Sequence, residues 1–129
     1  MEAAALREMF SAFGPVDVRR MFGGAGIFAD GMMIALASRE IVYLKSDADT
    51  APAFDREGME PFSYATRGGG LRVMTQYRRM PDRLYDDPDE LAQWARAALG
   101  VAARAAARAG RTTGRKGKAS PRKAIPPGF

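Results

Sequence analysis

The chain has 129 residues, of which 47% are hydrophobic, and it contains neither cysteine nor histidine. This length fits one domain with a packed core, because globular domains usually have about 100–200 residues. The missing residue types exclude disulfides, thiol nucleophiles, Cys/His zinc sites and imidazole acid–base catalysis. No run approaches the roughly 18 apolar residues of a membrane span, and the N-terminus does not resemble a secretory signal. We therefore expect a cytoplasmic protein.

Charge is distributed unevenly along the chain. Residues 1–103 contain all 15 acidic side chains and 12 of the 20 basic ones, whereas residues 104–129 contain basic residues and no acid. We call residues 104–129 the basic segment; its cations are Arg104, Arg108, Arg111, Arg115, Lys116, Lys118, Arg122 and Lys123. From about residue 110 its composition is too polar and too rich in glycine and proline to build a core. The sequence predicts a domain over 1–103, then the end of the last helix, then disordered chain.

The first elements follow from periodicity and turn residues. Leu6, Met9, Phe10 and Phe13 recur at helical spacing, and residues 14–15 (Gly-Pro) end that helix. Alternating residues from position 16 indicate a strand that reaches Met21-Phe22 and breaks at Gly23-Gly24. Asp-Gly at 30–31 lies between apolar runs, which is a strong hairpin signal. A second reversal at 38–40 precedes a strand over 41–45.

The second half contains a short helix, a hairpin and a longer helix. Asp49 or Thr50 is expected to cap the short helix, which Gly58 ends. Strands over 62–65 and 71–77 form a hairpin across the three glycines at 68–70. Asp87 is expected to cap the last helix, with Glu90 three residues later. The order α-β-β-β(-β)-α-β-β-α predicts an α+β fold with two layers, an antiparallel sheet and helices.

Several blocks of the sequence resemble the N-terminal domain of TfoX/Sxy proteins, bacterial regulators of DNA-uptake competence. The most specific block runs from Arg20 to Phe28 and ends in the Asp-Gly turn; its motif residues are Arg20, Met21, Phe22, Gly23, Gly24 and Gly26. Similar blocks occur at 43–47, 61–64, 77–81 and 89–95, in matching order from about residue 15 to 100. The resemblance implies a fold similar to that of type III secretion chaperones.

The resemblance also implies transcriptional regulation of competence genes, in full-length members together with the cyclic-AMP receptor protein. Full-length members have a second, helical domain where this chain has the basic segment. The family supplies no established catalytic residues that could be assigned to positions of this chain.

Other motifs have competing interpretations. Residues 24–29 fit the dinucleotide fingerprint G-x-G-x-x-A, but a strand follows where a phosphate-binding helix is needed, so a glycine turn or bulge is favoured. The acidic run at 82–90 could bind a divalent metal, yet anions also stabilise a helix N-terminus. Five large side chains could line a ligand pocket, but core packing is favoured because each falls in an apolar periodic pattern: Met21, Phe22, Tyr64, Tyr77 and Trp94.

The arginine pairs at 19–20 and 78–79 could form a phosphate-binding strip, although ion pairs with the acidic residues are favoured. The basic segment carries the clearest functional signal, because Lys and Arg without acids bind polyanions by releasing counterions. Arg104, Arg108, Arg111 and Arg115 would form one stripe on a helix, which Gly110 and Gly114 oppose.

We therefore expect a regulatory binding protein without cofactor, metal or membrane contact. We expect it to act through a protein partner such as a transcription factor and to bind nucleic acid nonspecifically through the basic segment. A homodimer is a further possibility for its assembly. The alternatives are a chaperone-like interaction module without DNA binding and, less favoured, a small enzyme, for which Lys45 is the only lysine of the domain.

Overall fold

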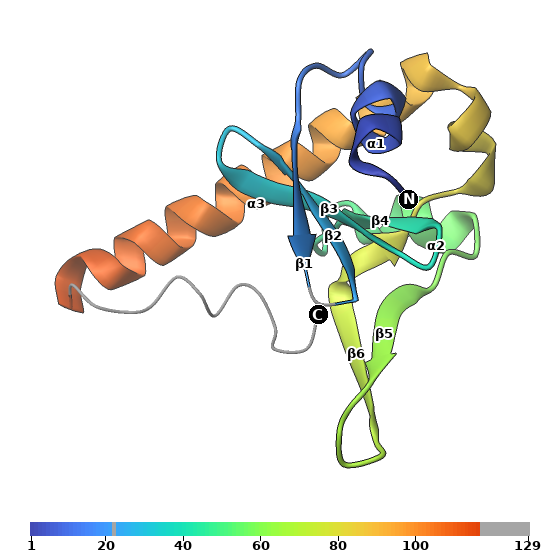
Figure 1. Cartoon of the computed structure of the whole chain (residues 1–129). Helices are drawn as coiled ribbons and strands as arrows, with labels where there is room; N and C mark the ends of the chain where they lie inside the picture. Colours follow the sequence, from blue (N-terminus) through green and yellow to red (C-terminus); the bar gives the residue numbers. More distant parts are fainter. Residues whose placement is uncertain (22, 117–129) are drawn as a thin grey trace.

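The computed structural model describes the backbone of residues 1–21 and 23–116 and the side chains of residues 1–21 and 23–110. The elements follow in the order α1 (Ala3–Met9), β1 (Asp17–Met21), β2 (Gly24–Ala29), β3 (Met32–Ser38), β4 (Ile41–Lys45), α2 (Ala51–Arg56), β5 (Pro61–Ala65), β6 (Leu71–Arg79), a 3-10 helix η1 (Asp82–Asp86) and α3 (Pro88–Lys116). The strands form one antiparallel sheet in the order β1-β2-β3-β4-β6-β5. The predicted α+β class and element order are confirmed, and η1 is an addition (Figure 1).

Both predicted reversals of the central strands are two-residue turns with positive φ. Asp30 and Gly31 have φ of 53° and 78°, the left-handed geometry that matches the twist of the flanking strands. Arg39 and Glu40 adopt the same region, with φ of 52° and 65°, although neither residue type favours it. The Glu40 carboxylate accepts a hydrogen bond of 3.0 Å from the N-terminal ammonium of Met1, which ties the start of the chain to this turn.

The glycine-rich motif between β1 and β2 is a close strand contact. Gly23 has a φ of 81° in the turn itself. At Gly24 a side chain would overlap the backbone oxygen of Ala37, because β2 and β3 approach each other closely there. At Gly26 a Cβ atom would lie 2.8 Å from the Cε atom of Met21, so this glycine makes room for that side chain. The dinucleotide interpretation is therefore wrong, since β2 occupies these residues. Phe22 lies outside the described residues.

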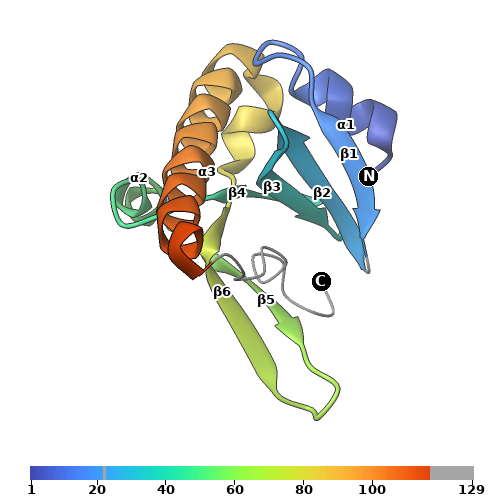
Figure 2. The same cartoon turned by 90° about the vertical axis from the view of Figure 1, so that its left-hand side faces the viewer.

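The main core cluster lies between the helices and the sheet. Helix α3 runs along β3 and β4 (Figure 2) and buries a stripe of mostly small side chains: Leu91, Ala95, Ala98 and Ala102. Alanines on the strands face this stripe at positions 25, 35 and 37. Small residues on both sides allow helix and sheet to pack closely.

A second apolar cluster joins β2 and β3 to the β5–β6 hairpin; its buried members are Phe28, Met33, Leu36, Phe62, Met74 and Tyr77. Met21 and Tyr64 are half-buried against this cluster, and Trp94 is half-buried against the main one. The structure thus packs Met21, Tyr64 and Tyr77 into the core, as the sequence analysis favoured, whereas Trp94 both packs against the core and lines a cavity. Phe22, the fifth, is not described.

The start of α3 combines the predicted cap with an interaction that was not predicted. The Asp87 carboxylate accepts the backbone N–H of Glu90 at 3.1 Å, as expected of an N-cap. The Glu90 carboxylate does not return to the cap. It accepts hydrogen bonds from Arg83 at 2.8 Å and from the Trp94 indole at 3.2 Å. Before it, the Tyr85 hydroxyl accepts the Val42 N–H at 2.9 Å, which fixes η1 against β4.

Helix α3 continues to Lys116, farther than the sequence analysis predicted. The expected loss of regular structure from residue 110 is not seen for residues 110–116, which have helical backbone. Alanine, the residue type with the highest helix propensity, occupies positions 103, 105–107 and 109, and the helix continues past Gly110 and Gly114, each of which costs about 1 kcal/mol relative to alanine. Residues 117–129 lie outside the described part of the chain. None of the described helices is long and apolar enough to cross a lipid bilayer.

The contact at Gly24 predicts a strongly destabilising substitution. Gly24→Ala forces β2 and β3 apart, and we expect the free energy of unfolding to fall by about 2–3 kcal/mol. Gly100→Ala, within α3, is the matched control: the new Cβ lies 3.5 Å from an Arg104 nitrogen, and helix propensity predicts a gain of about 1 kcal/mol. Urea denaturation measures both, and equal stability of the two variants would contradict the close contact.

Candidate nucleic-acid interface

Helix α3 carries positive charge away from the body of the protein. After Glu90 the sequence contains no acidic residue. From residue 103 to 110 every side chain except that of Ala105 is exposed, because the helix has left the sheet (Figure 1). Arg104 and Arg108 lie on this exposed part, one helical turn apart. The helical backbone continues through positions 111, 115 and 116, whereas Lys118, Arg122 and Lys123 lie outside the described residues.

The β4–α2 loop holds the base of this basic helix. Arg104 donates to the Asp47 carboxylate at 2.9 Å, across 57 residues of sequence. The other oxygen of Asp47 accepts the backbone N–H groups of Asp49 and Thr50, at 3.0 and 3.2 Å. Burial alone would raise the pKa of Asp47, but the hydrogen bonds from Arg104 and Thr50 outweigh it and lower the pKa.

This arrangement corrects the predicted cap of α2 and adds a contact to one residue of the predicted nucleic-acid interface. Neither Asp49 nor Thr50 caps α2 with its side chain; Asp47 binds the free N–H groups that precede the helix. One of the eight cations assigned to nucleic acid, Arg104, also pairs with an acid of the domain. Periodicity could not have found this contact, because its partners are far apart in the sequence and the loop has no fixed spacing.

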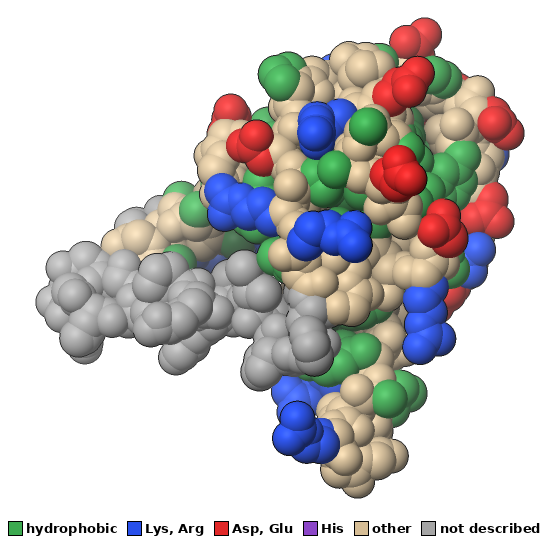
Figure 3. Space-filling model, viewed as in Figure 1, with side chains coloured by type: hydrophobic (Ala, Val, Ile, Leu, Met, Phe, Trp, Pro, Cys, Tyr) green, Lys and Arg blue, Asp and Glu red, His purple; other side chains and the backbone are tan. Residues whose placement is uncertain are grey.

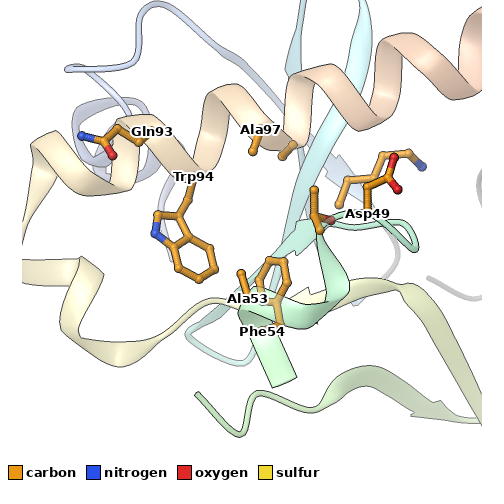
Figure 4. Close-up of a pocket in the computed structure, with 9 residues that line it drawn as sticks. Asp49, Ala53, Phe54, Gln93, Trp94 and Ala97 are labelled. Carbon is orange, nitrogen blue, oxygen red and sulfur yellow. The ribbon is translucent and has the colours of Figure 1, made fainter. Parts of the chain in front are cut away.

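Two cavities flank the same loop. One, of about 390 Å³, lies between α2 and α3, where Phe54 and Trp94 meet edge to face with ring centroids 5.1 Å apart (Figure 4). The other, of about 480 Å³, lies between the loop, β6 and α3, and Arg108 lines it. Lys45 lines both cavities.

The two arginines at the end of β6 form ion pairs. Arg78 contacts Asp55 at 2.6 Å, and Arg79 contacts Glu60 and Asp82 at 3.4 and 3.2 Å. The ion-pair interpretation is thus confirmed for residues 78–79. It is wrong for residues 19–20: in the described part of the chain neither has a carboxylate partner, and Arg19 lies over the Phe28 ring at 4.4 Å.

The β5–β6 hairpin forms a second basic element. It protrudes from the body (Figure 1), and residues 61–81 contain no acid. Arg67 and Arg72 are exposed and have no carboxylate within 4.0 Å among the described residues. In the view of Figure 3 acidic side chains gather over the upper part of the body, whereas the charged side chains seen on the hairpin are basic.

Three of the five carboxylates in the acidic run at 82–90 have partners within the fold. Asp82 pairs with Arg79, Asp87 caps α3, and Glu90 pairs with Arg83, which also contacts Glu57 at 2.6 Å. In the described ranges no three carboxylates come together in a way that could hold a metal ion. These contacts agree with the structural interpretation, in which the carboxylates stabilise the start of α3 and the segment before it.

Fold and charge together define a small α+β domain with a helix and a hairpin that extend from its body and carry cations but no acid beyond Glu90 and over residues 61–81. Residues 8–102 match the TfoX N-terminal domain, and the chain belongs to that family. No curated protein matches the sequence.

The Asp47–Arg104 contact predicts a pH-dependent effect. In Arg104→Gln the pKa of Asp47 should rise toward its usual range, because its main stabilising hydrogen bond is lost. A lowered folded-state pKa adds stability above the unfolded pKa of about 3.9, and this stability is lost as pH falls through the folded-state value. Wild type should therefore exceed the variant in unfolding free energy near neutral pH, and the difference should shrink in acid.

NMR titration of the Asp47 carboxyl and denaturation at several pH values measure these effects. Arg96→Gln, an exposed arginine on the same helix, is the control and should leave the Asp47 titration unchanged. An unchanged Asp47 titration in Arg104→Gln would show that the contact does not persist in solution.

Proposed function

We propose that this chain is a competence-regulator-like binding protein that acts in transcription through protein partners and holds nucleic acid through nonspecific phosphate contacts. The family supports the regulatory role. The proposed affinity for nucleic acid rests on one observation. The sequence has no acidic residue after Glu90, and the helix that continues from there extends beyond the body with its side chains exposed. Cations without internal partners remain available to release counterions from a polyanion.

Phosphate contacts of this kind position a protein without selecting a sequence. Specificity for particular genes would then come from the partner. The unpaired arginines of the hairpin, Arg67 and Arg72, add a second cationic contact away from the acidic residues of the body. In this proposal the domain 1–103 recognises the protein partner, and the basic segment supplies most of the affinity for nucleic acid, with a smaller contribution from the hairpin.

A second candidate is a chaperone-like interaction module without DNA binding. Leu71 and Val73 favour it, because they are 69% and 49% exposed and lie on the same face of β6. A module of this kind would bind a protein partner or a second copy through the hairpin, and the complex would persist at high salt.

Salt-titrated DNA binding separates the two. For six phosphate contacts log K should fall with log [salt] at a slope of about −5. Replacing Arg111, Arg115, Lys116 and Lys118 with glutamine should reduce the magnitude of that slope by about 3.6, since each of the four contacts contributes about 0.9. The control replaces four exposed arginines elsewhere, with the same change in net charge: Arg7, Arg39, Arg56 and Arg96.

Equal slopes for the two quadruple variants would contradict the assignment to the basic segment. No DNA binding by the wild-type chain at about 0.15 M salt, together with a partner complex that loses affinity in Leu71→Ser, would favour the chaperone-like module.

A further inference from the structure

The cavity beside the β4–α2 loop has a positively charged lining. Its charged residues are three cations and a single carboxylate: Lys45, Arg78, Arg108 and Asp47. Neutral polar side chains of Ser46, Thr75 and Gln76 complete the polar lining, and its volume of about 480 Å³ can hold a phosphate with an attached group. The two walls come from β4–β6 and from the exposed part of α3.

Two of these charged groups are already neutralised. The Asp47 carboxylate is bound by Arg104 and by two backbone N–H groups. Arg78 donates to Asp55 at 2.6 Å and to the Met59 carbonyl oxygen at 2.6 Å. Lys45 and Arg108 are the remaining cations, and within the described residues neither has a carboxylate within 4.0 Å.

Lys45 is a half-buried ammonium without a counterion. It lies opposite Tyr77 in the β4–β6 register, with its Nζ atom 4.9 Å from the centroid of that ring. Burial lowers the pKa of Lys45 and raises that of Tyr77, so the tyrosine stays neutral near pH 7 and cannot balance the charge. Asp49 lines the neighbouring cavity (Figure 4) but makes no ion pair with Lys45.

We propose that this cavity binds a phosphate group between Lys45 and Arg108. The ammonium supplies a compact charge and the guanidinium supplies two parallel donors, a combination that suits the oxygens of a phosphate. The phosphate belongs either to a nucleic-acid backbone or to a free phosphate compound. If the phosphate belongs to nucleic acid, the site is part of the proposed nucleic-acid interface, and this inference rests on the proposed function. If it belongs to a free phosphate compound, the inference is independent of the proposed function.

Calorimetric titration of the full chain with sodium pyrophosphate tests the site. Lys45→Met keeps the apolar stem over Tyr77 and removes the charge, and Arg108→Gln removes the second cation from an exposed helix position. Each should weaken pyrophosphate binding by about tenfold or more, the loss expected for a charge-assisted hydrogen bond. Arg96→Gln, which lies on α3 outside the cavity, should bind as wild type does.

A spectroscopic readout accompanies the titration. Pyrophosphate should raise the pKa of Lys45 in wild type, observed by NMR at its side chain, because an anion stabilises the ammonium. Unchanged affinity in both Lys45→Met and Arg108→Gln would overturn the proposal. So would the absence of both heat and a Lys45 shift when wild type is titrated to millimolar pyrophosphate.

A parallel titration of the same variants with duplex DNA identifies the source of the phosphate. If Lys45→Met weakens both pyrophosphate and duplex binding, the site holds a backbone phosphate. If it weakens pyrophosphate alone, the site holds a free phosphate compound. A wild-type chain that binds pyrophosphate but no DNA would refute the proposed nucleic-acid affinity and leave this site intact.

Discussion

The packing of the alanine-rich face of α3 against the central strands determines the position and direction of the basic end of this helix. Ala95, Ala98 and Ala102 are almost completely buried against the sheet, and their small size brings the helix close to β3 and β4. Because the same helix continues beyond the sheet, its axis also fixes the direction in which Arg108 and the following positions extend. The Arg104–Asp47 contact joins that extension to the loop after β4.

The arginines fall into two groups according to whether the fold gives them a carboxylate. Those that join η1 and β6 to the rest of the body, such as Arg78 and Arg83, are paired. Arg67 and Arg72 on the hairpin and Arg108 on α3 have no such partner among the described residues, and neither do the body arginines at positions 7, 19, 20, 39, 56 and 96. The acidic body therefore does not neutralise the cationic extensions. Most of the carboxylates near the base of the hairpin and of the exposed helix already form ion pairs with other arginines.

Local signals in the sequence were sufficient for most of the fold. Asp30-Gly31, the turn glycine Gly23 and the Asp87 cap each act over a few residues, so their chemistry could be inferred without a structure. Contacts between distant segments could not be inferred in this way. The Asp47–Arg104 pair and the cavity lined by Lys45 arise only when the β4–α2 loop meets α3, and the extra helical turns after residue 109 depend on a helix already anchored by packing. The unpaired state of Lys45 is likewise visible only in the assembled sheet.

The central claim is that polyanions contact the exposed part of α3 and not the surface around α1. Because the chain has no cysteine, a single introduced thiol can carry a photoreactive crosslinker. Ala107→Cys places it on the exposed helix, and Ala4→Cys places it on exposed α1. With duplex DNA at low salt, crosslinking from position 107 and little from position 4 is the expected result. Equal crosslinking from both positions, or crosslinking from position 4 alone, would contradict the account.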